Sequence, residues 1–310
     1  MIEYQRLIMA DTVRTAAFEK ALRTVVKPGC TLVDVGSGTG FLAFLASKFG
    51  AKRCILIERE PEFIKISKEM ARRSNITNCT FICGDSRDIK KSFNADIVIS
   101  ETLGNFAYEE NIIETLPDAR RFLKSGGVMI PQSLRIHAAP VVRAAQWKEV
   151  TVWDRVGFDL DWSPCKERSV NNMYVKKVEK ADLLPVPSHT TQWDEVLFAH
   201  GKIKSIRSAN LSWKLNHPAT IYGICLWWDC TLIPGITLST SPFAPPTHWQ
   251  QIFLPIPDPI AGASHDTIAC TLRSDSRRSV KINVQWEVLH KDKTGKELVQ
   301  CRMDMRRGAS

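Results

Sequence analysis

A glycine-rich turn followed by a distant acid is the first group of residues whose types and spacing can do chemistry. The segment 31–40 reads TLVDVGSGTG, so a β-branched run leads into Gly36, Gly38 and Gly40. Because glycine lacks a Cβ atom, a ligand can approach the backbone closely where such a strand ends. Roughly 20 residues further on, a second apolar run ends at Glu58, whose carboxylate can accept both hydroxyls of a ribose. Together these residues predict an adenosine site.

The spacing of the glycines separates two kinds of nucleotide site. The turn has Gly-x-Gly-x-Gly with Asp34 just ahead of it, whereas dinucleotide folds use Gly-x-Gly-x-x-Gly to seat a pyrophosphate on a helix N-terminus. NAD is therefore the weaker interpretation, and the strand context disfavours a tight turn without any ligand. Asp85 ends a further short run and could line the adenine, although an ordinary turn explains it nearly as well.

Two carboxylates flank a loop that contains a central glycine. The segment 100–111 reads SETLGNFAYEEN, with Glu101 near its start, Gly104 inside it and Glu110 near its end. A loop of this length can fold back so that both carboxylates point into one cleft. Taken alone, a chance pair of solvated side chains explains the pattern better, so these two residues need context from elsewhere in the chain.

The elements that must position these residues follow from hydrophobic periodicity. In the first 140 residues short β-branched runs alternate with helical periods, which predicts βαβ units and a parallel sheet covered on both faces. The expected strands are 31–35, 54–57, 80–82, 96–100 and 128–130. The expected helices are 42–49, 63–71 and 112–123.

The remaining part of the chain has a different pattern. All nine tryptophans lie in it, and short alternating segments at 219–227, 250–255, 266–272 and 280–288 are broken by Pro and Gly. This pattern predicts antiparallel β structure, a barrel or sandwich. We therefore divide the chain into a domain at 1–132, with a helical segment at 1–26, and a domain at 133–310. Residues 157–190, polar and weakly periodic, form an expected insertion.

Composition excludes several classes of protein. The net charge of +9 is spread evenly along the chain, so we expect no specific nucleic-acid surface. Apolar runs are far shorter than the roughly 20 residues of a membrane span. Nine scattered cysteines without a Cys-x-x-Cys pair favour reduced thiols over disulfides or a metal site. We expect a cytoplasmic protein, or also a nuclear one in a eukaryote.

The motifs together carry a family resemblance. The Asp-x-Gly-x-Gly-x-Gly turn resembles class I S-adenosylmethionine-dependent methyltransferases. Residues 11–15 read DTVRT, the segment 100–111 has its Ser-Glu and later Glu, and residues 247–249 read THW. In this order and spacing, they make the chain resemble the protein arginine methyltransferase family along nearly its whole length. The resemblance implies a Rossmann-like domain, a C-terminal β-barrel and, at 157–190, a helical arm for head-to-tail homodimers.

The same resemblance implies roles for individual residues. Arg14 would pair with the methionine carboxylate of the cofactor, Glu101 and Glu110 would hold the guanidinium of an arginine-containing protein or peptide, and no metal would take part. His248 would pair with Asp11, either as a proton relay or as a structural tie between the domains. The implied cofactor-binding residues are Arg14, Asp34, Gly36, Gly38, Gly40, Glu58 and Asp85, and the implied catalytic residues are Asp11, Glu101, Glu110 and His248.

Several features leave alternatives open. Only ten residues precede Asp11 and Tyr4 is their sole aromatic, so whether a lid closes over the cofactor is undecided. Thr102 and Asn105 differ from the asymmetrically dimethylating branch, which leaves the degree and symmetry of methylation undetermined. A pI near 9.1 also opposes encounter with a strongly basic substrate. The rival interpretations are a methyltransferase for another acceptor and a cofactor-binding scaffold without turnover, with an NAD-dependent oxidoreductase further behind.

Overall fold

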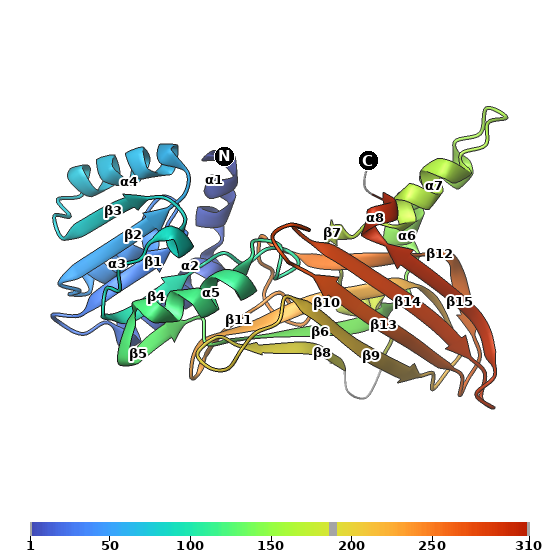
Figure 1. Ribbon diagram of the computed structural model, residues 1–310. Coiled ribbons are helices and arrows are strands. Elements are labelled where there is room, and N and C mark those ends of the chain that lie inside the picture. The colour runs from blue at the N-terminus through green and yellow to red at the C-terminus, as the bar shows by residue number, and fades with distance from the viewer. Residues whose placement is uncertain (1, 186–190, 309–310) are drawn as a thin grey trace.

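A parallel sheet organises the first part of the computed structural model, which describes residues 2–185 and 191–308 (Figure 1). The strands pair in the order β3-β2-β1-β4-β5. They are β1 (Thr31–Val35), β2 (Arg53–Glu58), β3 (Cys79–Cys83), β4 (Ala95–Ser100) and β5 (Leu123–Ile130). Because β2 and β4 flank β1 on opposite sides, the strand order reverses there, and a ligand crevice is expected beyond the carboxyl ends of β1 and β4. Every predicted strand of this sheet is present. The bounds of β1 to β4 agree with the prediction within one residue, whereas β5 begins five residues before the expected start at 128.

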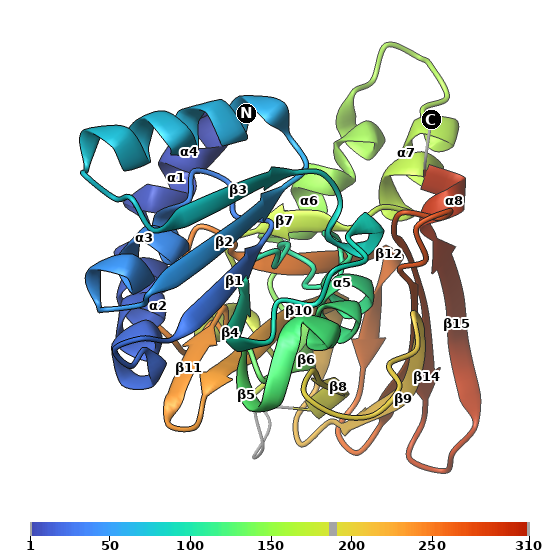
Figure 2. The same cartoon turned by 60° about the vertical axis from the view of Figure 1, so that its left-hand side comes forward.

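Helices cover both faces of this sheet (Figure 2). Right-handed crossovers place the connections β1 to β2 to β3 on one face and the connection β4 to β5 on the other. The helices are α1 (Ile2–Ala10), α2 (Thr12–Val25), α3 (Phe41–Lys48), α4 (Pro61–Arg73), η1 (Ser86–Asp88), α5 (Ile112–Ala119) and η2 (Arg120–Phe122). The Asp11 carboxylate caps α2 by accepting a hydrogen bond from the Arg14 backbone amide. This cap fixes where α1 ends and α2 begins.

The second part of the chain is an antiparallel β-domain made of two sheets. One has the order β7-β12-β10-β6-β8 with β11 paired to β10, and the other has the order β15-β14-β13-β9. Its strands are β6 (Ser133–Val141), β7 (Tyr174–Lys176), β8 (Thr191–Leu197), β9 (Ile206–Lys214), β10 (Ala219–Ile233), β11 (Ile236–Ser239), β12 (Gln251–Gly262), β13 (Thr267–Asp275), β14 (Asn283–Lys291) and β15 (Glu297–Asp304). The indole of Trp286 joins the two sheets by donating to the Pro255 carbonyl oxygen at 2.7 Å.

Strand β12 is longer than the sequence predicts. The expected segment is 250–255, and it ends at Pro255, a residue type that cannot donate a ladder hydrogen bond. The strand continues to Gly262, and its pairing with β10 is irregular between Pro255 and Ile260. Strand β7 pairs only with the first residues of β12, 251–253. The prolines therefore occupy a stretch of β12 in which few backbone amides have to donate to a neighbouring strand.

A helical projection leaves the β-domain at the side away from the parallel sheet (Figure 1). It comprises α6 (Ala145–Val150), η3 (Val152–Arg155) and α7 (Ser163–Val170). It thus begins earlier than the expected insertion at 157–190. Strand β7 and η4 (Lys180–Asp182) follow α7, and β7 belongs to the sheet because it pairs with β12. Residues 186–190 lie outside the described part of the chain, and the division at 132 stays a prediction.

The last described element is α8 (Met305–Gly308), which lies beside α7 near the C-terminus. Within residues 2–185 and 191–308, no helix is long and apolar enough to cross a membrane.

Candidate active site

A cavity of about 680 Å³ lies at the carboxyl ends of β1 and β4. Its lining includes the glycine turn 36–40, the loop 101–111, helix α1, the segments 57–59 and 84–86, and the loop 276–282 between β13 and β14. We call 101–111 the glutamate loop. His248 and Trp249 of the β-domain also reach this cavity, so both domains contribute to the site.

The glycine turn keeps its shape because each of its three glycines has a positive φ, between 51° and 86°. A Cβ atom on Gly40 would lie 2.6 Å from the Phe44 ring, and one on Gly36 would lie 2.8 Å from the Thr102 methyl group. Larger residues would therefore clash as well as strain the backbone. The turn leaves a backbone surface that faces the cavity, as the sequence predicts.

Two buried acids stand at the ends of the adjacent strands. The Glu58 carboxylate accepts hydrogen bonds from the backbone amides of Gly38 at 2.8 Å and Glu60 at 2.9 Å. Each carboxylate oxygen has a second acceptor position, so Glu58 is oriented without being saturated. Burial, helped by the charges of Glu58 and Glu101, raises the pKa of Asp34 to about 7. Asp34 also accepts from the Ala43 amide at the start of α3, at 3.2 Å.

Arg14 is not the free surface charge that a helix position alone would suggest. Its side chain is 6% exposed, and its Nε donates to Glu101 Oε2 at 2.9 Å. A second guanidinium nitrogen, Nη2, donates to the same oxygen. Its Nη1 is buried without a partner among the described residues. Arg14 therefore orients Glu101 and still offers one buried donor nitrogen.

Asp11 and His248 meet as the resemblance implies. His248 Nδ1 lies 2.8 Å from Asp11 Oδ2, and the His248 backbone amide donates to the same oxygen at 2.8 Å. Burial by itself would raise the pKa of Asp11. The hydrogen bonds from the Arg14 backbone amide and from His248 outweigh this effect, so the pKa of Asp11 is lower than usual. In the neutral tautomer that carries its proton on Nδ1, His248 donates to Asp11 and Nε2 is the acceptor nitrogen. That Nε2 is buried and has no hydrogen-bond partner in the described part of the chain.

The two consecutive acids of the glutamate loop have different surroundings. Glu109 is not a solvated charge: its carboxylate accepts from the Phe106 amide at 3.3 Å, and burial raises its pKa. Glu110 forms no hydrogen bond or ion pair with the described residues. Glu110 is exposed to solvent and also lines the cavity. Desolvation on its cavity side and the charges of Glu101 and Glu109 raise the pKa of Glu110 to about 7.

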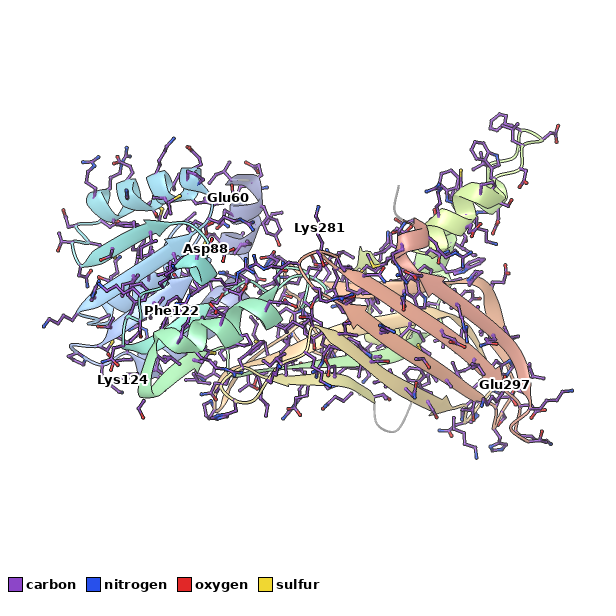
Figure 3. All side chains as sticks on the ribbon, in the orientation of Figure 1. Glu60, Asp88, Phe122, Lys124, Lys281 and Glu297 are labelled. Carbon is purple, nitrogen blue, oxygen red and sulfur yellow. The ribbon has the colours of Figure 1, made fainter. Side chains whose placement is uncertain are left out.

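Asp85 lies in the cavity wall but is already paired. Arg87 donates to both its oxygens at 2.8 and 2.6 Å, and Arg278 of the loop 276–282 donates at 3.1 Å. Partial burial by itself would raise the pKa of Asp85. The hydrogen bonds from Arg87 outweigh this effect, so the pKa of Asp85 is lower than usual. Asp85 therefore joins the two domains across one side of the cavity, which the sequence does not indicate. Lys281 of the same loop also reaches the cavity and stands at the domain boundary (Figure 3).

Helix α1 covers the cavity, so a lid is present despite the short segment before Asp11. Tyr4, Gln5, Ile8 and Met9 line the cavity from this helix. The amide group of Gln5 lies over Gly38, 3.4 Å from where a Cβ atom would be. Burial and the nearby Glu110 raise the pKa of Tyr4 to about 12. The sequence left the presence of a lid undecided, with Tyr4 as the sole aromatic residue before Asp11.

The described residues contain no group of three or more His, Cys, Asp or Glu side chains placed to hold a metal ion. The residues that sequence reasoning missed are mainly in the β-domain. Arg278 and Lys281 lie far along the chain from the glycine turn, and no local motif marks them.

Two family models match the chain. A methyltransferase domain matches residues 26–194, and the arginine methyltransferase oligomerization subdomain matches residues 132–291. Each covers more than half of the chain. The chain therefore belongs to the protein arginine N-methyltransferase family, a class of S-adenosylmethionine-dependent methyltransferases.

Particular relatives extend this similarity over most of the chain. Protein arginine N-methyltransferase 1 of Saccharomyces cerevisiae is 28% identical over 304 residues, covering 90% of this chain and 84% of the relative. Probable protein arginine N-methyltransferase 3 of Arabidopsis thaliana is 27% identical, and the match covers 88% of this chain but only 49% of that relative. The chain thus spans about half the length of some curated relatives.

Solved structures share the fold. A PRMT1 enzyme–prozyme heterotetrameric complex with AdoHcy from Trypanosoma brucei superimposes with a TM-score of 0.84 at 20% identity, covering 98% of both chains. Protein arginine methyltransferase 10 of Arabidopsis thaliana, described in an open conformation, gives 0.79 at 20% identity and the same coverage. The predicted fold, a Rossmann-like domain followed by an antiparallel β-domain, is confirmed.

Proposed function

We propose that this protein transfers a methyl group from S-adenosylmethionine to a guanidino nitrogen of arginine in a protein or peptide. The observation that carries the proposal is that one cavity has two ends with different chemistry. A glycine turn with Glu58 forms one end, and Glu101 and Glu110 form the other. The first end suits a nucleoside, and the second suits a planar cation.

The residues at the nucleoside end fit the cofactor. Arg14 Nη1 is a buried donor without a partner, which suits the carboxylate of a methionine moiety. The glycine turn would hold the methionyl end, and the remaining acceptor positions of Glu58 would hold the ribose hydroxyls. Asp34 would support the turn, and Asp85 would border the adenine. When bound, S-adenosylmethionine supplies an electrophilic methyl group on a positively charged sulfur.

Glu101 and Glu110 would hold the guanidinium by charge-assisted hydrogen bonds to separate nitrogens. Such bonds fix the plane of the group and draw positive charge toward the nitrogens that they contact. The third nitrogen becomes more nucleophilic, and its lone pair is oriented by position. Arg14 fixes the orientation of Glu101, because two of its nitrogens bind one oxygen of that carboxylate.

Proton removal has two candidate acceptors. The methylated guanidinium must lose a proton, because a free arginine side chain has a pKa above about 12. His248 Nε2 is a buried acceptor nitrogen held by Asp11 through Nδ1. Glu110, whose pKa is raised to about 7, is the other candidate.

We also propose that the protein forms a homodimer through its helical projection. Phe158 is 84% exposed and Leu160 is 62% exposed, both between η3 and α7. Large apolar side chains displayed together in this way are typical of surfaces that bind another protein. The oligomerization subdomain to which this region belongs supports the same interpretation.

The test is to locate the transferred label. Purified protein is incubated with S-adenosylmethionine labelled in its methyl group and a peptide that contains one arginine, and tandem mass spectrometry identifies the modified atom. Glu110→Gln should lower turnover at least about 100-fold, a typical loss for a charge that acts in the transition state. Its affinity for S-adenosylhomocysteine, measured by calorimetry, should stay within a few-fold. Glu62→Gln, an exposed acid on α4, is the matched control. A label on lysine, or unchanged turnover in Glu110→Gln, would contradict the proposal.

A further inference from the structure

The glutamate loop has no helix or strand of its own, so its shape depends on bonds to the β-domain. Two indoles hold its first half. Trp249 Nε1 donates to the Leu103 carbonyl oxygen at 2.7 Å, and Trp228 Nε1 donates to the Gly104 carbonyl oxygen at 3.2 Å. The second half carries Glu110, so it needs a separate anchor.

Tyr108 is that anchor. Its side chain is fully buried, and its hydroxyl donates to Asp194 Oδ2 on β8 at 2.6 Å. Arg207 on β9 binds both oxygens of Asp194, with Nε at 2.6 Å from Oδ2. Burial and the Asp194 charge keep the pKa of Tyr108 well above its usual value, so the hydroxyl stays a donor at neutral pH. Three side chains from three segments thus form one buried, charge-compensated group.

The backbone of β8 has an irregularity at this place. Asp194 pairs with Ile136 of β6, but the next pair skips Trp193, so Trp193 is an extra residue in the strand. In a regular strand, Trp193 and Asp194 would point to opposite faces. Here the Trp193 ring lies 6.1 Å from the Tyr108 ring while Asp194 accepts the Tyr108 hydroxyl. Bulges of this kind re-aim side chains beside functional sites.

We infer that Asp194, held by Arg207 and re-aimed by the bulge at Trp193, positions Glu110 through Tyr108. The inference rests on the proposed function, because it concerns where Glu110 meets a guanidinium. Only Glu109 separates Tyr108 from Glu110, and the Glu109 amide is itself turned back onto the Phe106 carbonyl oxygen at 2.9 Å. The Tyr108 hydroxyl therefore sets the position of the carboxylate that follows. Asp194 and Arg207 are positioning residues, since neither lines the cavity.

Tyr108→Phe tests this inference, because it removes one oxygen and leaves the Asp194–Arg207 pair intact. We expect kcat/KM for an arginine peptide to fall 10- to 100-fold, since a misplacement of about 1 Å can cost about 100-fold. The affinity for S-adenosylhomocysteine should stay within twofold. Amide hydrogen exchange at residues 103–110 should become at least tenfold faster. The acid limb of the pH profile should also move to lower pH, because Glu110 would relax away from Glu101.

Asp194→Asn should give the same pattern, and Asp266→Asn is its matched control. Asp266 is also a buried acid of the β-domain and pairs with His290 at 2.8 Å, but it precedes β13, whereas the loop 276–282 that reaches the cavity follows the other end of that strand. If Asp194 served only to stabilise the fold, Asp194→Asn and Asp266→Asn would both lower the thermal midpoint, and neither would move the pH profile. Unchanged exchange and an unchanged pH profile in Tyr108→Phe would overturn the inference. If the wild-type protein methylates no arginine peptide, the proposed function fails, while the exchange data still decide whether Tyr108 anchors the loop.

Discussion

The carboxylates of the site differ because their neighbours differ. Glu101 is held by Arg14, Glu109 by the backbone of its own loop, and Glu110 by no described side chain. An unpaired acid beside two others is costly to ionise, which is why its pKa rises. A guanidinium placed between Glu101 and Glu110 would remove that cost. The free site is therefore poised for a cation.

This arrangement predicts a pH dependence set by Glu110. Below about pH 7 the carboxyl is protonated and cannot pair with a guanidinium, so kcat/KM for an arginine peptide should fall as pH decreases from 8 to 6. A pH–rate profile measures this. Asp34 has a similar pKa, so the profile is repeated with Asp34→Asn, in which the limb should persist. A flat profile between pH 6 and 8 would contradict the assignment.

The raised pKa of Glu110 also affects the free energy of unfolding. Its dependence on pH is opposite to that of an acid whose pKa is lowered by a salt bridge. The folded pKa of about 7 exceeds the usual 4.5, so stability is lost as pH rises from about 4.5 through about 7. Glu110→Gln should remove that loss and therefore melt higher than wild type at pH 8.

Part of the site could be predicted from residue types and spacing. The glycines and Glu58 stand where their spacing indicates, because each follows or ends a strand. The pairing of His248 with Asp11 was implied only by the family resemblance, and the two side chains do meet. The Arg14–Glu101 pair could not be predicted, since the resemblance assigned these two residues to two different ligands. Asp85 was expected at the adenine, and its arginine partners come from separate parts of the chain.

At the scale of elements, two segments bracket the cavity. Helix α1 lies over the glycine turn, and the loop 276–282 reaches Asp85 from the β-domain. The periodic strands of the parallel sheet were predictable because each one is a short apolar run. The contact of the loop 276–282 was not, because it joins residues far apart in the sequence and depends on how the domains pack.

The link between Arg278 and Asp85 predicts a kinetic effect. Arg278→Ala should speed the dissociation of S-adenosylhomocysteine several-fold, as measured by stopped-flow fluorescence. The thermal midpoint should change little, because Arg278 is 40% exposed and such ion pairs contribute at most about 1 kcal/mol. Arg277→Ala is the matched control, since among the described residues Arg277 forms an ion pair only with Asp275, the last residue of β13. Equal dissociation rates in both variants would refute the link.

At the scale of the whole molecule, the net charge and the site have opposite signs. The chain carries +9, yet acids outnumber basic residues in the cavity lining by six to four. The acids are Asp34, Glu58, Asp85, Glu101, Glu109 and Glu110, and the basic residues are Arg14, Arg59, Arg278 and Lys281. Charges separated by more than about 8 Å are largely screened at physiological salt, so the local acids dominate for a side chain inside the cavity. The basic pI therefore does not prevent recognition of one arginine.

Assembly can be tested at the same scale. Replacing Phe158 and Leu160 together by glutamate should convert the proposed dimer into monomers, because the exposed apolar surface of the helical projection is lost. Sedimentation velocity measures the mass, and circular dichroism checks the fold. Val299→Glu, at an exposed apolar position on β15, serves as control. The same sedimenting mass in all three proteins would exclude this interface.

The most direct measurement compares two peptides on two proteins. Binding of an arginine peptide and its citrulline counterpart, which is nearly isosteric but uncharged, is measured by calorimetry at pH 8 with S-adenosylhomocysteine present. The account predicts that wild type loses at least about 100-fold in affinity with citrulline, and that Glu110→Gln loses only a few-fold, because bonds to a charged group are the strong ones. Equal losses in both proteins would mean that Glu110 does not hold the guanidinium.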